Sequence, residues 1–434
     1  MTLHQAARSP HQSIGGLALD VSWWVWFVVI ASLCFLGITT TLPVIVFMAG
    51  SMVYGLARPG LALKAIFSFW LPWIYVLFAA MSVLWSHYPA WTLRASTQFV
   101  FSTGVFLVMV HALPAKSFLT VYLSALLLAD AASVADPRMA WNTQGLAMIG
   151  IFGSKNAFGT TQALLIQVGV WVLLDHGQRG LMRALALIGV VGGSVLIVAA
   201  LSVGAVVPLF GALACSLLAF NLRHFPPRSR VVCLCAGALL TAILCSFLIV
   251  FGDELFQSAL QITGKSATLS DRTPLWNVAK KMMQEHPIGG VGFQAFWQHG
   301  NPYAEDLWRQ FQPARAGYHF HNLWYQSGVD LGYIGLGLAF LTVAITAIEV
   351  MRWVVRSPSP ASCFFLGYVA FIIPRSMLEV GFFAQFSFEG AIFLAAFVYA
   401  RQSRERYEAE GRFRSDVEEQ IGAISNPRSA GFSR

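Results

Sequence analysis

The sequence predicts an all-α integral membrane protein, and its composition and its apolar pattern carry this prediction. Of the 434 residues, 57% are hydrophobic and 11% are charged, whereas a soluble domain carries about 25% charged residues. Continuous apolar stretches recur along nearly the whole chain, and each has roughly the 17–25 residues that a helix needs to cross a bilayer. A membrane β-barrel would show alternating segments of about ten residues instead.

The apolar stretches predict about twelve membrane-spanning helices. They lie at residues 22–38, 41–57, 65–85, 95–111, 117–134, 157–174, 184–200, 204–220, 231–251, 322–350, 361–380 and 383–400. The chain therefore divides into nine helices over 1–251, an external loop over 252–321, three helices over 322–400 and a tail over 401–434. The tail has seven Arg, six Asp and Glu and few apolar residues, so we expect disorder or a short surface helix.

Basic residues predict the orientation, because cytoplasmic loops collect Lys and Arg. If the N-terminus is cytoplasmic, the inner connections between residues 58 and 356 hold ten basic residues. The short outer connections then hold four, which are Arg94, Arg138, Lys155 and Arg375. Both termini are therefore expected in the cytoplasm, and the loop over 252–321 faces outward. The same rule explains the net charge of +8, so no nucleic-acid partner is expected.

The external loop is far longer than the other connections, and loops of this length are usually functional or disordered. Its aromatic residues, among them Trp276, Trp297 and Trp308, are too numerous for disorder. Residues 273–286 place a proline just inside the start and apolar residues at helical spacing. This pattern predicts an amphipathic helix that lies over the external face of the membrane.

The stretch "YHFHNLWYQSGVDLGYIGLGLAF" (318–340) places two histidines before a glycine-spaced apolar run. His321, or His319 two residues earlier, could act as a general base, because histidine titrates near neutrality. Alternatively, a histidine here caps or packs the helix start beside Asn322. The pair could also bind a metal, but no third ligand is evident nearby, so no metal is expected. The six cysteines lie in apolar stretches and predict neither a disulfide nor structural zinc.

Three arginines could bind phosphate at the outer surface of the membrane. Arg272 opens the predicted amphipathic helix, and its planar guanidinium suits a phosphate, although a surface ion pair is the alternative. Arg94 starts one span at its outer side, and Arg375 lies near the outer end of another, where a charge usually pairs or lines a cavity. Glu379 and Glu389 are the candidate partners of Arg375, and an ion pair that aligns helices is the alternative there.

Arginines at the depth of a lipid phosphate, with a histidine above them, fit an enzyme that acts on a lipid-linked phosphate. Fixed cations would stabilise the negative charge of a departing diphosphate, and the histidine would accept the proton of an attacking hydroxyl. Neither a metal nor another cofactor is then required. Exposed tryptophans could stack on sugar rings, although membrane interfaces also collect tryptophan.

Four stretches resemble, in the same order, motifs of the O-antigen ligase and O-antigen polymerase family of bacterial envelope glycosyltransferases. They are "SVLWSHYPAWTLRAS" (82–96), "GIFGSKNAFGTTQALL" (150–165), "DRTPLWNVAKKMMQEHPIGGVGFQAF" (271–296) and "HNLWYQSGVDLGYIGLG" (321–337). The "WSHYP…TLR" and "SKN" pieces are most similar to the exopolysaccharide polymerase branch of this family.

The resemblance implies a GT-C-like fold and an inverting, metal-independent transfer of a glycan from undecaprenyl diphosphate to a sugar hydroxyl. It places this reaction on the periplasmic face of the bacterial inner membrane, with His321 as the base and Arg272 as a diphosphate ligand. The implied partners are the lipid-linked oligosaccharide, the glycan acceptor, the bilayer and other polysaccharide export proteins. The expected supporting residues are His319, Asn322, Glu379, Lys155, Asn156 and Trp276.

The chain departs from the family pattern at two positions. Many relatives carry an arginine after the seventh span, whereas "ALSVGAVVPL" (200–209) has none. Arg94 or Arg375 is expected to replace it as a donor-binding residue. Ser154 stands before Lys155–Asn156, where relatives often have a histidine, so the role of that stretch stays open.

Polymerisation of exopolysaccharide or O-antigen repeat units is the favoured function, and an O-antigen ligase acting on lipid A-core is the alternative with the same donor. A lipid-linked glycan flippase or transporter would place its cations near the middle of the membrane, in broken helices. A scaffold of an export complex would need no base. Substitution of His321 by alanine separates these functions, because it should inactivate only an enzyme.

Overall fold

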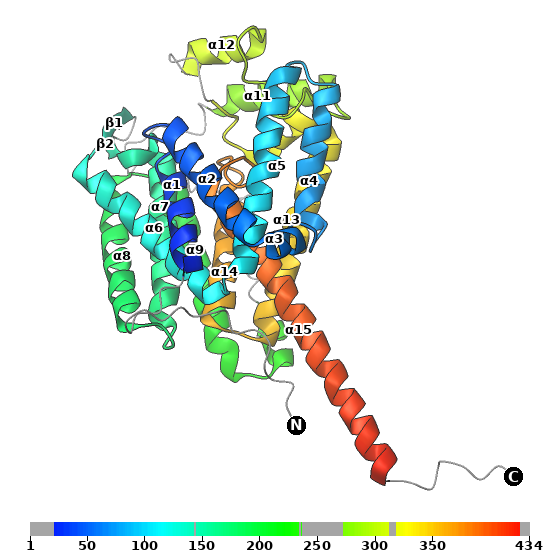
Figure 1. The fold of residues 1–434 in the computed structure, drawn as a ribbon. Coiled ribbons are helices and arrows are strands. Elements are labelled where there is room, and N and C mark those ends of the chain that lie inside the picture. The colour runs from blue at the N-terminus through cyan, green and yellow to red at the C-terminus, as the bar shows by residue number, and fades with distance from the viewer. Residues whose placement is uncertain (1–20, 143–144, 234–235, 237–271, 312–317, 426–434) are drawn as a thin grey trace, which may run out of the picture.

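The computed structural model describes residues 21–142, 145–233, 236, 272–311 and 318–425, and helices dominate this part of the chain (Figure 1). The helices are α1 (Val21–Cys34), α2 (Thr41–Ala57), α3 (Pro59–Ile66), α4 (Leu71–Met81), α5 (Pro89–Ala112), α6 (Ala115–Ala135), α7 (Lys155–Leu174), α8 (Gly180–Ala199), α9 (Val203–Asn221), α11 (Thr273–Glu285), α12 (Pro302–Phe311), α13 (Leu323–Arg356), α14 (Pro360–Arg375) and α15 (Phe388–Ser425). Short 3₁₀ turns lie at Ser82–Leu84, Gly150–Phe152 and Leu222–His224, and β1 (Met139–Asn142) pairs antiparallel with β2 (Gly145–Met148).

Six of the described helices are long and apolar enough to cross a membrane, and the pair α2–α3, bent by 108°, would make a seventh. The six are α5, α6, α7, α8, α9 with the turn that follows it, and α13. Three further apolar helices, α1, α4 and α14, are shorter. A helical, multi-pass membrane protein is therefore confirmed. The number of twelve spans stays a prediction, because most of the predicted span 231–251 lies outside the described residues.

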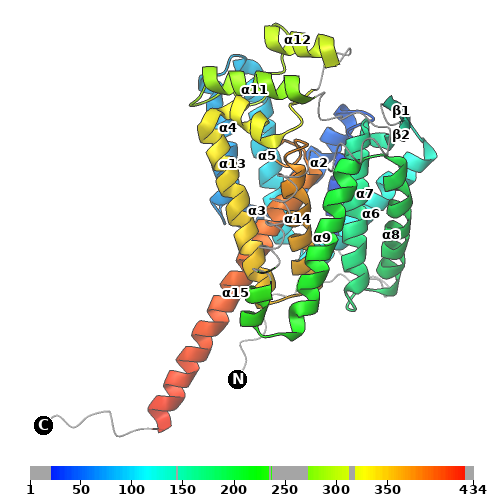
Figure 2. The same cartoon turned by 180° about the vertical axis from the view of Figure 1, so that it is seen from behind.

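The helices share one large hydrophobic core. α1 packs on α2 and α6, α7 packs on α8, and α9 packs on α14, while α13 packs on α4, α14 and α15. α14 also contacts α7, so it joins the group of α7, α8 and α9 to the group of α13 and α15. Figures 1 and 2 show α11 and α12 lying across one end of the bundle, called here the α11 end. The C-terminal half of α15 projects from the opposite end.

The predicted span 65–85 is not one continuous helix, because the chain turns inside it. α3 ends at Ile66 and α4 begins at Leu71, and residues 67–70 lie outside any helix. Pro72 occupies the first turn of α4. A proline is tolerated there but disfavours a helix that continues from the preceding residues. The apolar run therefore forms a short helix rather than part of one long span.

The last two predicted spans, 361–380 and 383–400, have wrong boundaries. α14 ends at Arg375, and α15 begins only at Phe388. Pro374 cannot donate a backbone hydrogen bond at the end of α14. The Ser387 hydroxyl accepts a hydrogen bond from the Gly390 N–H at 2.9 Å and so caps the start of α15. Residues 376–387 consequently form an irregular segment, called here the 376–387 connection.

The chain after residue 400 is helical as far as Ser425. Of the two alternatives expected for the tail, disorder is therefore wrong over this range, and the helix continues from α15. Arg404 pairs with Glu408, one turn along α15, at 2.7 Å. Arginine and glutamate are good helix formers, and pairs at this spacing add a few tenths of a kcal/mol each. Arg404 also lies 3.1 Å from Glu349 of α13, which fixes the start of the extension to the bundle.

The predicted amphipathic helix over 273–286 is confirmed as α11. Its buried residues, Leu275, Ala279, Met282 and Met283, form one stripe along the helix. This stripe belongs to a second hydrophobic cluster, which also contains Leu307 and Trp308 of α12 and Phe320. α11 packs against α13, so this part of the predicted external loop is a folded cover over one end of the bundle.

α13 is not one regular helix, because Gly332 has φ 64° and ψ −166°. Only glycine adopts this backbone conformation readily. The backbone N–H groups of residues 291–292 donate to the carbonyls of residues 329–330 at 3.0 and 2.9 Å. The N–H of Tyr333 donates to the carbonyl of Pro287 at 2.7 Å. The glycine-rich segment after α11 therefore satisfies the hydrogen bonds that the break in α13 leaves open.

The motif that precedes and enters α5 holds the same glycine-rich segment from the other side. The indole N–H of Trp85 donates to the carbonyl of Gly289 at 2.8 Å. The Ser82 hydroxyl accepts from the N–H of Phe293 at 2.9 Å, and the Thr92 hydroxyl donates to the carbonyl of Phe293 at 3.0 Å. Two of the motifs that resemble the family are thus in direct contact.

Candidate active site

The polar segment before α13 is anchored by Asn322. The Asn322 Oδ1 accepts hydrogen bonds from the N–H groups of Trp324 and Tyr325 at 2.9 and 3.1 Å, so this residue is the N-cap of α13. Its Nδ2 donates to the carbonyl of Met377 at 3.1 Å. Asn322, predicted as a supporting residue, therefore joins the start of α13 to the 376–387 connection.

The two histidines lie against each other in the turn that leads to this cap. His321 has a φ of 48°, in the left-handed region that is uncommon for a residue other than glycine. Its N–H donates to Nδ1 of His319 at 3.1 Å, and the two ring centroids are 4.1 Å apart. The Trp276 indole donates to the carbonyl of Phe320 at 3.0 Å, so this predicted residue supports the turn from α11.

Glu379, in the 376–387 connection, is the centre of the site. Its Oε1 accepts a hydrogen bond from Nδ2 of Asn156 at 2.6 Å and lies 3.4 Å from Nη2 of Arg272. Nδ1 of His321 lies 3.2 Å from both carboxylate oxygens. Nε2 of His319 lies 3.7 Å from Oε2. Side chains from three separate parts of the chain therefore meet at a carboxylate that is only 9% exposed.

The neighbours of Glu379 keep it ionised despite its burial. Burial raises the pKa of this carboxyl group, but the hydrogen bond from His321 and the positive charges of His321, His319 and Arg375 outweigh that effect and hold the pKa at about 2. At neutral pH Glu379 is thus a carboxylate. Burial lowers the pKa of His319 to about 4, and the charges of His321 and Arg272 add to this shift. His319 is therefore a neutral imidazole at neutral pH.

The ionised carboxylate also sets the tautomer of His321. A carboxylate can only accept hydrogen bonds, so Nδ1 of His321 must carry the proton that points to Glu379. The other ring nitrogen, Nε2, is then unprotonated in the neutral imidazole and can accept a proton. A carboxylate on Nδ1 also stabilises the imidazolium that forms after proton transfer. The arrangement suits a general base.

Arg375 ends α14 beside this cluster and is 5% exposed. Its Nη2 donates to the carbonyl of Asn156 at 3.5 Å, and its Nε is buried with no hydrogen-bond partner among the described residues. The predicted ion pair with Glu379 or Glu389 does not form within 4.0 Å in the part of the chain that the structure describes. A buried guanidinium with unused donors is costly unless an anion completes its hydrogen bonds.

Arg272 contributes a second guanidinium to the cluster. Besides its contact with Glu379, its Nη1 donates to the carbonyl of Leu378 at 2.7 Å. Arg94, by contrast, is exposed, and its guanidinium lies over the ring of Trp91, 5.6 Å from the centroid, with no ion pair among the described residues. Lys155 begins α7 next to Asn156. The structure thus brings Arg272 and Arg375 to the histidines and leaves Arg94 apart.

The turn that lacks an arginine, 200–209, also reaches the site. The hydroxyl of Ser202 donates to Oδ1 of Asn156 at 3.4 Å. The backbone carbonyl of the same asparagine accepts from Arg375, so Arg375 and this turn contact one residue. Ser154 accepts a hydrogen bond from the N–H of Ala157 at 3.1 Å and caps α7. The sequence did not indicate Ser202, because a serine in an apolar run carries no signal of its own.

The two histidines and Glu379 are also close enough together to be considered as metal ligands. The sequence showed no third ligand beside the histidine pair, but the structure supplies one. Ligand atoms of His319, His321 and Glu379 all lie within 4.8 Å of one another. His and carboxylate groups suit Zn²⁺ and related cations. Arg272, however, already places a positive charge 3.4 Å from Glu379, which disfavours a second cation at this carboxylate. Metal independence stays a prediction.

Comparison with known proteins agrees with the motifs. Residues 188–341 match the family described as O-antigen ligase. This region contains Arg272, both histidines and the break in α13. The chain is also 27% identical, over 71% of its length and 72% of the relative's, to the exopolysaccharide production protein ExoQ of Rhizobium meliloti (strain 1021). The resemblance to the O-antigen ligase and polymerase family, with its exopolysaccharide branch, is therefore confirmed for this membrane protein.

Proposed function

We propose that the protein is a glycosyltransferase of envelope polysaccharide biosynthesis, which moves a glycan from undecaprenyl diphosphate to a hydroxyl of an acceptor sugar. The cluster around Glu379 carries this proposal, because it combines an oriented imidazole with two guanidinium groups in one partly buried site. The resemblance to an exopolysaccharide production protein favours the polymerisation of repeat units. The partners are then the lipid-linked oligosaccharide, the acceptor glycan, the bilayer and other export proteins.

In the proposed reaction, Nε2 of His321 takes the proton of the acceptor hydroxyl while its oxygen attacks the anomeric carbon of the donor sugar. The bond from that carbon to the diphosphate breaks, and its electron pair leaves with the diphosphate oxygen. A single displacement of this kind inverts the anomeric configuration. Glu379 holds His321 in the required tautomer and stabilises its protonated form.

Arg272 and Arg375 stabilise the charge that develops on the leaving diphosphate. Fixed cations in a partly buried site act more strongly than in water and need no reorganisation during the reaction. The Nε of the buried Arg375 side chain has no hydrogen-bond partner among the described residues. It is therefore available to donate to a diphosphate oxygen. Its contact with Asn156, which Ser202 also contacts, favours Arg375 over Arg94 as the substitute for the arginine missing from 200–209. No metal ion is needed in this scheme.

The proposed site faces the periplasm. At the end of the bundle opposite the α11 end, Arg352, Arg401 and Arg404 surround the buried Glu349 at 3.1, 3.6 and 3.1 Å. An excess of positive charge marks the cytoplasmic side of an inner-membrane protein. With this end in the cytoplasm, the α11 end and the histidines lie at the outer leaflet, where flipped lipid-linked glycans are presented.

A lipid A-core ligase and a glycan flippase are the competing functions. A ligase would use the same donor site and differ only in the acceptor. A flippase would need cations near the middle of the membrane, whereas Arg272 and Arg375 join a cluster at the α11 end. The ligase is therefore the second candidate function, because it would use the same donor and the same reaction.

The test uses purified protein in lipid nanodiscs with polyprenyl-diphosphate oligosaccharide as the only sugar substrate. A polymerase yields a ladder of longer lipid-linked glycans, and His321→Ala abolishes it. A ladder that forms equally well with His321→Ala removes this histidine from the mechanism. If wild-type protein forms no ladder but transfers glycan when lipid A-core is added, the ligase is correct. No transfer under either condition contradicts the enzyme.

A further inference from the structure

A polar cavity of about 290 Å³ opens beside the histidines. It lies between α4, α5 and α13, under the segment that follows α11 and next to the 376–387 connection. Among the residues of the candidate active site described above, His319 alone lines this cavity. Its volume is near the lower end of ligand pockets, which hold roughly 300–1,000 Å³. A ligand of one or two small rings would fit.

The floor of the cavity is formed by α13, just before the break at Gly332. Gln326 and Asp330 are 8% and 1% exposed, and Nε2 of Gln326 donates to both carboxylate oxygens of Asp330 at 3.1 Å. Among the described residues no cation pairs with Asp330. The backbone of Gln294 also hydrogen-bonds to this side chain. Because a carboxylate can accept about four hydrogen bonds, about one acceptor site of Asp330 is left for a donor on a ligand.

Aromatic and amide side chains form the walls. Trp91, Trp297 and Tyr318 line the cavity together with Gln294 and Gln298. The two tryptophans come from different elements, since Trp91 belongs to the first turn of α5. Aromatic faces bury apolar C–H groups, while the amides supply donors and acceptors. The set suits a ligand with an apolar face and hydroxyls around its edge.

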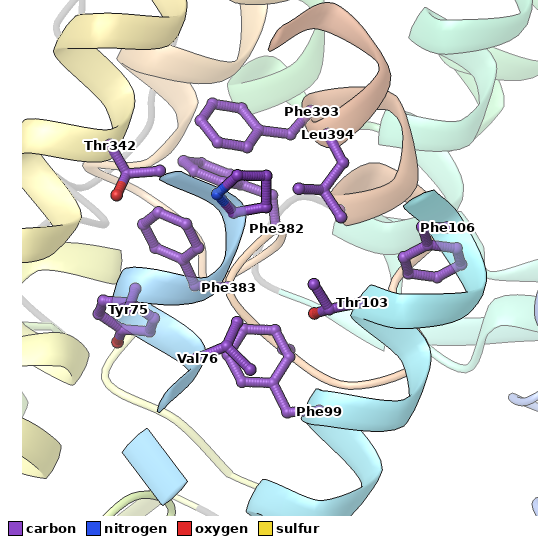
Figure 3. Close-up of a pocket in the computed structure, with 13 residues that line it drawn as sticks. Tyr75, Val76, Phe99, Thr103, Phe106, Thr342, Phe382, Phe383, Phe393 and Leu394 are labelled. Carbon is purple, nitrogen blue, oxygen red and sulfur yellow. The ribbon is translucent and has the colours of Figure 1, made fainter. Parts of the chain in front are cut away.

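The described lining offers no cation to the diphosphate of the donor. No lysine or arginine lies among the described residues that line the cavity, so nothing there compensates the charge of a diphosphate. A neighbouring pocket shares Tyr75 and Phe383 with it but is lined almost entirely by apolar side chains, such as Phe99 and Phe382 (Figure 3). Hydroxyl groups buried there would lose their hydrogen bonds. Of these two pockets, a neutral, polyhydroxylated ligand therefore fits the polar cavity and not the apolar one.

We propose that this cavity binds a sugar ring of the glycan substrate, with Trp91 and Trp297 against its faces and Asp330 and Gln326 as hydrogen-bond partners of its hydroxyls. The inference deepens the function proposed above and rests on it. The ring is that of the acceptor, because only His319 of the cluster reaches the cavity while Arg272 and Arg375 lie outside its lining. An acceptor hydroxyl at the His319 side of the cavity would lie next to the histidine pair, whose ring centroids are 4.1 Å apart.

The test measures binding without turnover. Oligosaccharide released from the lipid-linked repeat unit by mild acid is titrated against the protein in nanodiscs, and inorganic pyrophosphate is titrated separately. We expect Trp91→Leu and Asp330→Asn each to weaken oligosaccharide binding at least tenfold and to leave pyrophosphate binding unchanged. Arg272→Ala should do the reverse. Because Trp91 is 43% exposed, its replacement should not disturb folding even if that of Asp330 does.

Trp141→Leu is the matched control, since Trp141 lies on β1, is 81% exposed and does not line the cavity. It should bind both probes like wild type. Wild-type affinity for the oligosaccharide in Trp91→Leu and Asp330→Asn overturns the proposal, as does the absence of oligosaccharide binding by wild-type protein. These outcomes do not depend on turnover, so they are distinct from a failure of the transferase assay.

A kinetic measurement then separates the two sources of the sugar. For an acceptor site, Trp91→Leu raises the KM of released oligosaccharide added as acceptor and leaves the KM of the lipid-linked donor unchanged. The opposite pattern assigns the ring to the donor, which corrects the source and keeps the sugar site. Unchanged KM values for both substrates contradict a role of the cavity in sugar binding.

Discussion

At Glu379, four side chains share one buried carboxylate, and they explain why it stays charged. Asn156 and His321 hydrogen-bond to it, Arg272 pairs with it, and His319 lies 3.7 Å away. Transfer of an unpaired carboxylate into such a site would cost several kcal/mol. The residue therefore acts on the two histidines and the arginine at once, and its substitution tests the whole cluster.

Glu379→Gln removes the charge but keeps an oxygen that can accept a hydrogen bond. We expect its kcat to fall by about 10²–10⁴, the usual contribution of a general base, because His321 loses the group that fixes its tautomer and stabilises its protonated form. The rate of glycan-ladder formation in nanodiscs measures this effect. Glu285→Gln, which alters an exposed pair on α11, is the control. A Glu379→Gln protein that keeps wild-type kcat contradicts the assigned role.

The lowered pKa of His319 predicts how stability depends on pH. Its pKa is about 4 in the folded protein and about 6.5 in an unfolded chain. Between these values the unfolded chain binds more protons, so stability is complete above about pH 6.5 and falls as the pH drops toward 4. His319→Asn removes this contribution.

The measurement for His319 is the Tm in nanodiscs between pH 7 and pH 4. We expect the Tm of His319→Asn to decline less steeply than that of wild type over this interval. Glu379, with a pKa of about 2 in the folded protein, also begins to lose its contribution to stability below about pH 5, but it is present in both proteins and lowers both curves. Parallel curves for the two proteins would show that the folded pKa of His319 is not lowered.

At the scale of elements, the break in α13 fixes the glycine-rich segment that leads into the wall of the polar cavity. The glycine-rich segment after α11 binds to the open backbone groups of α13, and the 82–96 motif holds that segment from the other side. These three stretches were separate motifs in the sequence. In the structure they form one hydrogen-bonded unit around Gly332.

Gly332→Ala should therefore be strongly destabilising. A Cβ atom at this position would lie 2.3 Å from the carbonyl oxygen of Ile288, and the φ of 64° is unfavourable for alanine. Strained backbone of this kind costs on the order of 1–3 kcal/mol before the clash is counted. We expect a lower Tm and loss of glycan transfer.

Gly337→Ala, one turn and a half further along α13, is the matched control. A Cβ atom there meets nothing within 4 Å, and alanine favours a helix by about 1 kcal/mol over glycine. Its Tm should be equal to or above that of wild type. Similar Tm values for the two alanine variants would show that the break at Gly332 is dispensable.

At the scale of the whole molecule, the two ends of the bundle differ in charge and in cover. α11 and α12 lie across one end, and the extension of α15 projects from the other (Figure 1). The candidate site lies at the start of α13, whereas the arginines around Glu349 lie toward the end of α13 and on α15. We expect the α11 end to face the periplasm and the extension of α15 to lie in the cytoplasm.

Single cysteines test this orientation in a background without the native cysteines. Gln310→Cys on α12 and Ala409→Cys on α15 introduce thiols at exposed positions of the two ends. In intact spheroplasts, a membrane-impermeant maleimide should label Gln310→Cys, and it should label Ala409→Cys only after the cells are lysed. The reverse pattern would place the proposed site in the cytoplasm, where it would not meet flipped lipid-linked glycans.

The sequence by itself determined the features that depend on local chemistry. Apolar runs predicted the membrane helices, the spacing of Leu275 and Met282 predicted α11, and residue type identified His321, Arg272 and Arg375 as candidates. Its errors lie where local pattern is ambiguous. The ends of α14 and α15 depend on Pro374 and on the cap at Ser387, which an apolar run conceals.

Only the tertiary structure decided which of these residues lie together. Asn156, Arg272, His321 and Glu379 are far apart in the chain, and no spacing rule brings them to one carboxylate. The same is true of the cavity, since Trp91 and Asp330 line it together although they are far apart in the chain. Helix packing and non-local hydrogen bonds fix the distances between these residues. Local sequence patterns do not specify such distances.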